Sequence, residues 1–173
     1  MLSVPRAPWA EPDLLKSRFL EESASRHPDA GGSAEAFTSL NAAWQTLRHP
    51  ASLLRHFLEL EHPEALAKTP RTPADLGDLF MDIAAARQAA QQFGVQWAAA
   101  TSPLARSLLE AGRRGLVTRF GGLSTQVATR LDAALAPLIA GERDPAKLTE
   151  LLARLVFLGK WADQLREASL TLG

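Results

Sequence analysis

The sequence contains no cysteine and no tyrosine, and the first absence removes whole classes of site. Without cysteine there is no disulfide framework, no thiolate zinc site, no cysteine nucleophile and no iron–sulfur cluster held by the chain's own thiolates. Long apolar runs are also missing, so no segment is expected to cross a bilayer, and the first six residues lack the apolar stretch of a signal peptide. We therefore expect a protein of a reducing, cytoplasmic compartment.

An excess of charge of either sign is missing as well. The 19 lysines and arginines balance 19 aspartates and glutamates, so the chain as a whole is not built to bind nucleic acid or an anionic membrane. Paired carboxylates, a nucleophile with its base, and a phosphate-binding loop are not found together anywhere. The sequence therefore predicts a binding protein rather than an enzyme.

Strand-forming patterns are also absent. β-branched residues are sparse, whereas alanine, leucine, arginine, glutamate and glutamine, which favour helices, dominate the composition. The fold class is expected to be all-α. With 173 residues, the chain is long enough for one ordinary domain or for two small ones.

Three helices are expected in the first 60 residues. The first starts near Glu11-Pro12-Asp13 and must end before Pro28, because the residue before a proline is pushed out of the helical region. The second has Ser33 as its cap and is ended by His49-Pro50. Its apolar stripe consists of Phe37, Leu40, Trp44 and Leu47. The third spans residues 51–60, with apolar residues at Leu53, Leu54, Phe57 and Leu58.

The best domain boundary is the segment 61–73, which holds three prolines. Beyond it we expect helices over residues 74–93, 103–138 and 145–170, joined by short links as an antiparallel three-helix bundle. Gly121-Gly122 is expected to break or bend the second of them, because paired glycines weaken a helix. The core stripe of the third is expected at Leu148, Leu151, Leu155, Leu158, Ala162 and Leu165.

The tripeptide His27-Pro28-Asp29 falls in the loop between the first two expected helices, away from both apolar stripes. The histidine ring can donate and accept hydrogen bonds, the proline stiffens the turn, and the aspartate adds a charge. An ordinary proline turn with a solvated histidine would also fit, but the helix–loop–helix context favours a rigid tip that docks into a partner. The arrangement resembles the J domain, which recruits and activates heat-shock ATPase chaperones of the DnaK and HscA type.

Other segments narrow this resemblance. Residues 40–60 resemble the J-proteins of iron–sulfur cluster assembly, the HscB/Jac family, and residues 78–89 and 147–165 resemble the first and last helices of that family's scaffold-binding domain. The resemblance implies an L-shaped, all-helical protein with a J domain at 1–60, a linker at 61–73 and a three-helix scaffold-binding bundle at 74–173. It also implies that the chain binds no cofactor, delivers an IscU-type iron–sulfur scaffold protein, and stimulates a DnaK/HscA-type ATPase rather than catalysing a reaction itself.

The resemblance assigns the chaperone-binding residues. They are His27, Pro28 and Asp29 in the loop with Lys16, Arg18 and Arg26 on the first helix. The sequence departs from the family by Ala30, where a basic residue is usual, and by the few residues that precede the first helix, which cannot hold all of the family's additional short helix. Asp13, Glu21 and Glu22 offset the three cations, so docking is expected to depend only weakly on salt, and a merely solvated face is an equal alternative.

The resemblance also assigns scaffold-binding residues, Phe80, Met81 and Phe157. By its spacing Phe80 is expected to face the bundle core, whereas Phe157 and Trp161 are expected off the core stripe. Those two aromatic residues indicate either a binding patch or a second packing surface for the amino-terminal domain. The glutamates usual around this patch in the family are replaced by Ala85, Gln88 and Gln92.

Two alternatives to delivery of a scaffold protein remain open. One is a general J-protein that serves protein folding with another client on the bundle, and the other is a helical interaction protein whose loop no longer activates a chaperone. A metal site is not expected, because the spacing of His49, His56 and His62 suits no usual ligand set.

Overall fold

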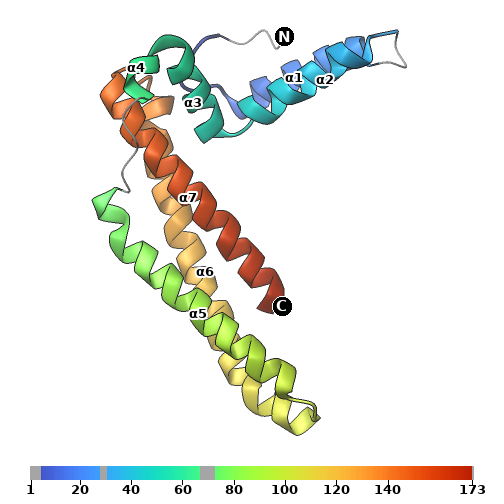
Figure 1. Ribbon diagram of the computed structural model, residues 1–173, viewed down its shortest axis with the longest axis vertical. Coiled ribbons are helices and arrows are strands. Elements are labelled where there is room, and N and C mark those ends of the chain that lie inside the picture. Colours follow the sequence, from blue (N-terminus) through green and yellow to red (C-terminus); the bar gives the residue numbers. More distant parts are fainter. Residues whose placement is uncertain (1–4, 28–30, 67–72, 173) are drawn as a thin grey trace. The chain divides into compact units, whose positions relative to one another are not determined.

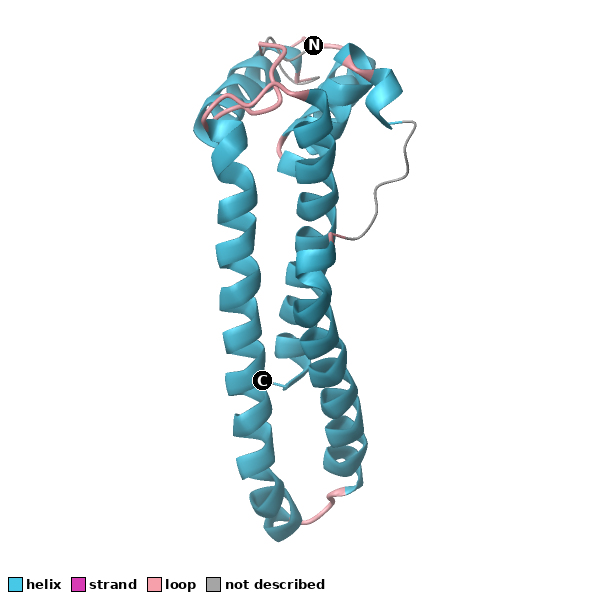
Figure 2. Ribbon diagram, turned by 90° about the vertical axis from the view of Figure 1, so that its left-hand side faces the viewer, coloured by secondary structure: helices cyan, strands magenta, loops and turns pink. Residues whose placement is uncertain are grey.

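The computed structural model describes residues 5–27, 31–66 and 73–172, and the regular elements of these residues are all helices (Figures 1 and 2). The all-α prediction is confirmed. Within this part of the chain, no helix combines the length and the apolar character needed to cross a membrane.

The described residues divide into two compact units. The first unit holds the residues up to Leu66 together with Ala134–Leu155, and the second holds residues 73–133 and 156–172. Helices α6 (Pro103–Ile139) and α7 (Pro145–Leu172) contribute residues to both units.

The first unit begins with an antiparallel hairpin of α1 (Pro12–Arg26) and α2 (Ala34–Leu47), which lie side by side in Figure 1. Pro12 occupies the first turn of α1, where its missing N–H costs nothing. The hydroxyl of Ser33 accepts a hydrogen bond from the backbone N–H of Ala36 at 3.0 Å, so the predicted cap of α2 is confirmed.

Few side chains hold this hairpin together. Leu15 is the buried residue of α1 and Leu40 the buried residue of α2, with 3% and 1% of their surfaces exposed. The half-buried rings of Phe19 and Trp44 stack next to them, with centroids 4.8 Å apart and planes 16° from parallel. The expected stripe of α2 is therefore only partly buried, because a two-helix hairpin covers one side of each helix.

The rest of the first unit is more deeply packed. It comprises α3 (Pro50–Glu61), the four-residue α4 (Pro63–Leu66) and the adjoining ends of α6 and α7. The four apolar residues predicted for the third helix are all buried. The guanidinium of Arg143, in the α6–α7 turn, lies 5.8 Å from the centre of the Phe57 ring.

This grouping differs from the expectation that all of residues 74–173 belong to one bundle. Residues 134–155 contribute buried leucines to the unit that contains α3. These leucines are Leu138, Leu148, Leu152 and Leu155. Helices as long as α6 and α7 present apolar positions far beyond the reach of α5, and those positions are buried with α3 instead.

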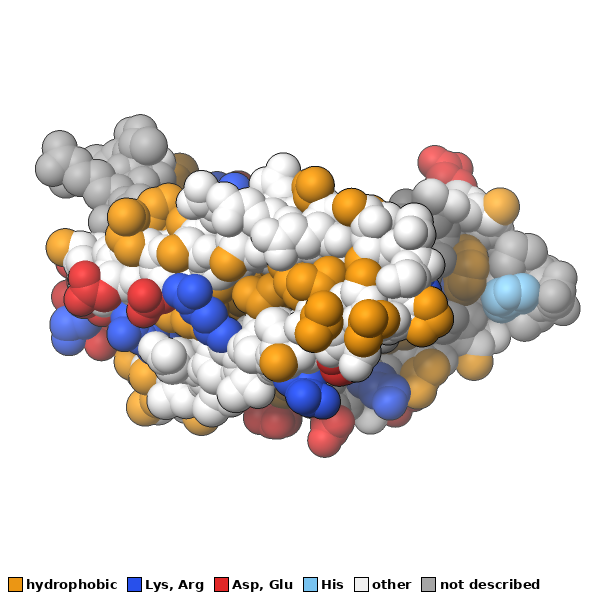
Figure 3. All heavy atoms as spheres, turned by 90° about the horizontal axis from the view of Figure 1, so that it is seen from below, with side chains coloured by type: hydrophobic (Ala, Val, Ile, Leu, Met, Phe, Trp, Pro, Cys, Tyr) orange, Lys and Arg blue, Asp and Glu red, His pale blue; other side chains and the backbone are white. Residues whose placement is uncertain are grey.

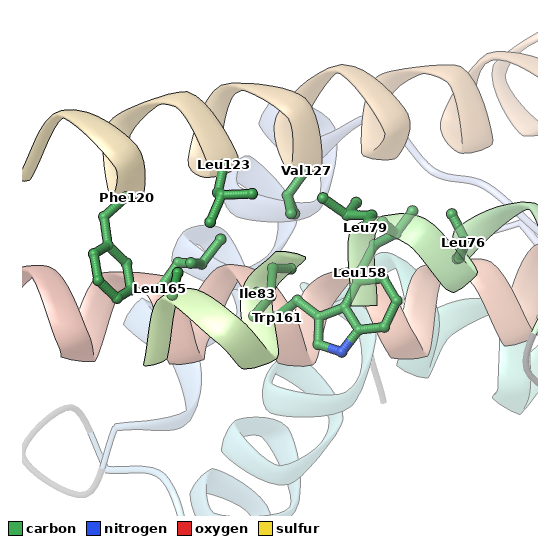
Figure 4. Packing of buried hydrophobic residues seen from close by; sticks show 10 residues of the cluster. Leu76, Leu79, Ile83, Phe120, Leu123, Val127, Leu158, Trp161 and Leu165 are labelled. Atoms are coloured by element: carbon green, nitrogen blue, oxygen red, sulfur yellow. The ribbon is translucent and has the colours of Figure 1, made fainter. Parts of the chain in front are cut away.

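The second unit is a three-helix bundle. A single 3₁₀ turn (η2, Ala74–Leu76) leads into α5 (Gly77–Ala99), which packs with α6 and α7. Figure 4 shows the side chains from the three helices pointing toward one another. The buried cluster consists of Leu76, Leu79, Ile83, Ala86, Phe120, Leu123, Val127, Leu158, Trp161 and Leu165.

Three details of α6 and α7 correct the sequence-based expectations. Helix α6 runs without interruption through Gly121-Gly122, because the packed apolar face on either side outweighs the weak helix propensity of two glycines. At two positions of α7 the buried residue differs from the expected one. Leu152 is buried in place of Leu151, and Trp161 in place of Ala162. These two expected residues are only half-buried, one residue away along the chain, and so are rotated by about 100° around the helix axis.

Candidate functional site

His27 lies where α1 ends, and its backbone is fixed on both sides. Its N–H donates to the carbonyl of Ser23, and its own carbonyl accepts from the N–H of Gly32, each at 3.0 Å. The other members of the motif, Pro28 and Asp29, lie outside the described residues, as does Ala30. The described part of the loop thus closes over the end of α1 through the hydrogen bond to Gly32.

Two glycines make this closure possible. Gly31 has a φ of +85°, a conformation that residues with a side chain rarely adopt. Gly32 approaches α1 so closely that a Cβ there would overlap the backbone of Arg26. The pair Gly31-Gly32 is therefore required by the geometry of the loop.

The imidazole of His27 is half-buried and packs edge-on against the ring of Phe37 in α2, with centroids 5.0 Å apart and planes at 76°. The expectation that His27 lies away from both apolar stripes is wrong, because Phe37 is the first residue of the α2 stripe. Since the turn brings the end of α1 back to the start of α2, the ring is held in a defined orientation by a neighbour that is itself part of the hairpin.

The three cations assigned to chaperone docking differ in their surroundings. Arg26 pairs with Glu22 at 2.6 Å and Arg18 pairs with Glu21 at 3.4 Å, both within α1. Lys16 is exposed, and no carboxylate in the described part of the chain pairs with it. The Arg18–Glu21 pair is exposed and the Arg26–Glu22 pair half-buried, and together they neutralise two of the three charges locally. The positive face of α1 is accordingly weak.

The residues assigned to scaffold binding surround one buried ring. The rings of Phe80, on α5, and of Phe157, on α7, each lie 6.1 Å from the ring of Trp161. Trp161 is 3% exposed and belongs to the core cluster, so the prediction that it lies off the core face is wrong. Phe157 is half-buried against that cluster.

Phe80 is 50% exposed and Met81 is 65% exposed, so the prediction that Phe80 faces the core is also wrong. The core stripe of α5 passes through Leu79 and Ile83, and Phe80 is rotated from Leu79 by about 100°. One side of its ring nevertheless lies next to Trp161, and the rest of the ring is open to solvent. Phe80, Trp161 and Phe157 thus form an apolar patch across α5 and α7, here called the aromatic patch.

Three exposed positions on α5 where the family carries glutamates are uncharged here. Ala85, Gln88 and Gln92 are all exposed, so this face can form apolar contacts and neutral hydrogen bonds but offers no carboxylate at these positions. Among the described residues, no three His, Asp or Glu side chains gather closely enough to hold a metal ion.

The sequence pattern missed two functional neighbours, Phe37 beside His27 and Trp161 as the centre of the aromatic patch. The spacing of four between Phe157 and Trp161 placed the two rings on one side of α7. It did not reveal which of them faces the core, because both fit one broad apolar stripe.

Comparisons with known proteins establish the fold. No model of a protein family matches the sequence, and no curated protein matches it. The structure is similar to that of the chaperone HscB from Vibrio cholerae, with a TM-score of 0.56, over 99% of this chain and 96% of that one. The chain has the HscB fold. The two sequences are 18% identical, so the likeness is one of fold, and it confirms the all-helical fold of the HscB type that the sequence resemblance implies.

Proposed function

We propose that this protein is a J-type co-chaperone that binds a heat-shock ATPase of the DnaK or HscA type and stimulates its ATP hydrolysis. The observation that carries the proposal is the HscB fold over 99% of the chain, with His27 anchored at the turn of its amino-terminal hairpin. The chain itself performs no chemistry in this proposal, and the residues of the loop act by docking.

The hairpin explains how a histidine without catalytic function can affect another protein. The ring of His27 is oriented by Phe37, and its backbone by Ser23 and Gly32. A ring held in this way loses little conformational entropy when it docks, so more of its interaction energy remains for biasing the partner. The bias works only if the ring binds one state of the ATPase better than the other, and the coupling free energy resides in that difference.

For the client, we propose that the aromatic patch on α5 and α7, with the neighbouring Met81, holds an iron–sulfur scaffold protein of the IscU type. Phe80 and Met81 expose about half or more of their surfaces, and the buried Trp161 supports Phe80 from behind. Exposed apolar side chains on a rigid support are typical of the central contacts of protein interfaces. Iron and sulfide would be cargo of the scaffold, whose delivery the J domain couples to hydrolysis.

The test of the proposal is a single-turnover ATPase assay with DnaK- and HscA-type chaperones and three forms of the full chain. The unmodified chain should accelerate hydrolysis, and His27→Gln should abolish the acceleration while the far-ultraviolet circular dichroism stays unchanged. His56→Gln is the matched control, because its side chain is 45% exposed in the same unit, with Nδ1 3.9 Å from the carboxylate of Glu59. Equal acceleration by all three forms, or by none, would refute the proposal.

One observation favours a second candidate, a J-type co-chaperone with a different client. The neutral Ala85, Gln88 and Gln92 leave the rim of the aromatic patch without the acidic contacts that the resemblance implies. Binding of a purified IscU-type scaffold to the unmodified chain and to Met81→Ser separates the two candidates. Ordinary ATPase stimulation without scaffold binding would retain the co-chaperone and replace the client.

A further inference from the structure

The charges of the chain are unevenly distributed along it. Between Asp82 and Asp132, over most of α5 and α6, six arginines stand against a single acidic residue, Glu110, although the whole chain is neutral. This stretch carries an excess of five positive charges and holds no lysine. The arginines are Arg87, Arg106, Arg113, Arg114, Arg119 and Arg130. The α5–α6 pair of helices is therefore a basic surface within the second unit.

A cavity of about 680 Å³ opens among these helices and the last turns of α7, apart from the aromatic patch. Its apolar lining includes Phe93 and Trp97 of α5, whose rings lie 5.8 Å apart and are tilted by 31°. Both rings are half-buried, and the small residues Gly94 and Ala168 leave space beside them. Such a volume accommodates one or two large side chains of a partner.

The charged groups of the lining are not equivalent. Arg113 donates from Nε and Nη2 to the carboxylate of Glu110 over 2.7–3.0 Å, and this hydrogen bonding lowers the pKa of Glu110, to which the positive charge of Arg114 also contributes. Glu110 is thus neutralised by its neighbours. Arg87 and Glu167 remain, and within the described residues neither side chain forms an ion pair.

Exposed apolar side chains accompany the basic ones at the end of the bundle where α5 and α6 are joined. Val95, Leu104 and Leu108 are 70%, 72% and 76% exposed. Figure 3 looks onto this end and shows hydrophobic side chains in the middle of the face, with lysine or arginine and some acidic side chains at its margin. Arginine and aromatic residues are enriched in protein-binding surfaces, and the centres of such surfaces are more apolar than the rest of the protein surface.

We propose that the groove between α5, α6 and α7 docks an acidic segment of a partner protein. A large apolar side chain of that segment enters beside Phe93 and Trp97, and a neighbouring carboxylate pairs with Arg87. The excess of arginine steers the acidic partner toward the groove, and the hollow shape suits a protruding side chain better than the flat surface of a membrane. This surface is separate from the loop at His27 and does not depend on the proposed ATPase stimulation.

The test uses a synthetic amphipathic helix of leucine and glutamate, labelled for fluorescence anisotropy, and the full chain. Arg87→Gln should weaken binding by about fivefold, because it removes the carboxylate partner. Glu167→Gln should strengthen binding by about twofold, because it removes the repulsion within the lining. Arg119→Gln is the matched control, since Arg119 is exposed on α6 but does not line the cavity, and it should change binding by less than about twofold.

Two comparison probes decide what the groove recognises. The same peptide with lysine in place of glutamate should bind at least about tenfold more weakly, and vesicles of phosphatidylserine and phosphatidylcholine should not compete. The proposal is overturned if the acidic peptide does not bind, if the two peptides bind alike, or if Arg87→Gln and Arg119→Gln have equal effects. Competition by the vesicles would overturn it in favour of a membrane-binding surface.

Discussion

The α1–α2 hairpin and the α5–α7 bundle are both helical, but different interactions hold them together. The hairpin fully buries one side chain from each of its helices, Leu15 and Leu40, and adds the stack of Phe19 on Trp44. The bundle core draws nine buried residues from three helices and a tenth, Leu76, from the 3₁₀ turn that precedes α5. A structure with few contacts depends on each of them, whereas one with many tolerates the loss of any single one.

The turns and helices of the two regions also use glycine differently. In the hairpin loop, Gly32 fits against the backbone of Arg26, where no side chain has room. In the bundle, glycines on α6 such as Gly115 have open space around them. The hairpin, which carries the proposed chaperone contact, thus has the smaller core and a backbone that tolerates no side chain at Gly32.

The largest expected effect on the free energy of unfolding comes from truncating a buried leucine. Leu40→Ala and Leu165→Ala should each cost about 2–5 kcal/mol, because both side chains are essentially inaccessible to solvent. The two variants should differ in which amides lose protection from hydrogen exchange. Hydrogen exchange should show the α1–α2 amides of Leu40→Ala losing protection first, while Leu165→Ala should lower the protection of the bundle helices and leave the α1–α2 amides unchanged. Equal, global loss of protection in both variants would show that the two regions unfold together.

Alanine substitutions at glycines should act in opposite directions in the two regions. Gly32→Ala should destabilise the protein by about 1–3 kcal/mol, because the loop must shift away from Arg26. Gly115→Ala should stabilise it by about 0.5–1 kcal/mol, because the position is exposed inside a helix. Urea unfolding of both variants measures the two changes. A destabilising Gly115→Ala would contradict the open space around this position of α6.

Substitutions in and beside the aromatic patch should distinguish a side chain that stabilises the fold from one that is free to contact a client. Phe157→Ala should cost about 1–3 kcal/mol, because the ring is half-buried against Trp161 and the core cluster. Met81→Ala, at a residue 65% exposed, should cost less than about 0.5 kcal/mol. Thermal unfolding measures both costs, and affinity for a client measured alongside it shows whether Met81 acts as a contact. Equal costs would place Met81 in a packed environment.

The two charged surfaces should respond differently to salt. Docking through α1 should change only slightly as ionic strength rises, because Glu21 and Glu22 pair with Arg18 and Arg26. Binding of the acidic peptide to the α5–α6 groove should weaken by about tenfold between 50 and 300 mM salt. Association rates across one salt series test both. A steep fall for chaperone docking would indicate that it uses a basic surface other than α1.

The smallest effect concerns the α6–α7 turn. Hydrogen bonds from the backbone N–H groups of Asp144 and Arg143, together with the side chain of Lys147, lower the pKa of Glu142. A lowered pKa in the folded state means that the stabilisation is present above the ordinary pKa of 4.5 and is lost as the pH falls through the lowered value. Glu142→Gln should therefore lower the melting temperature slightly at pH 7 and not at pH 2. Equal shifts at both values would assign the effect to packing.

Much of this fold was predictable from the sequence. Proline positions and the Ser33 cap placed the helix ends of the hairpin within one or two residues, because both act locally. What failed was the assignment of faces. Phe80 and Trp161 each lie one residue away from an alternative apolar position, and only the three-dimensional partner helices decide between faces about 100° apart.

For the candidate sites too, local features were predictable from the sequence and contacts between helices were not. The loop residue His27 was found from a short motif, but its contact with Phe37 depends on how the turn folds back, which no spacing encodes. The basic character of the α5–α6 pair was readable from the letters alone, between Asp82 and Asp132, but it was masked by a net charge of zero. The cavity was not readable, because it requires three helices at known distances.

The uninterrupted passage of α6 and α7 from one unit to the other has a consequence for modularity. The segment rich in proline looks like a natural place to divide the gene, yet α3 belongs to the same unit as residues 134–155, which lie on the other side of it. A fragment ending near Pro73 would leave the buried leucines of α3 without that part of their unit. The segments on either side of the proline-rich stretch are therefore not independent modules, and an exchange of parts with another protein of this fold must carry α3 and the α6–α7 turn together.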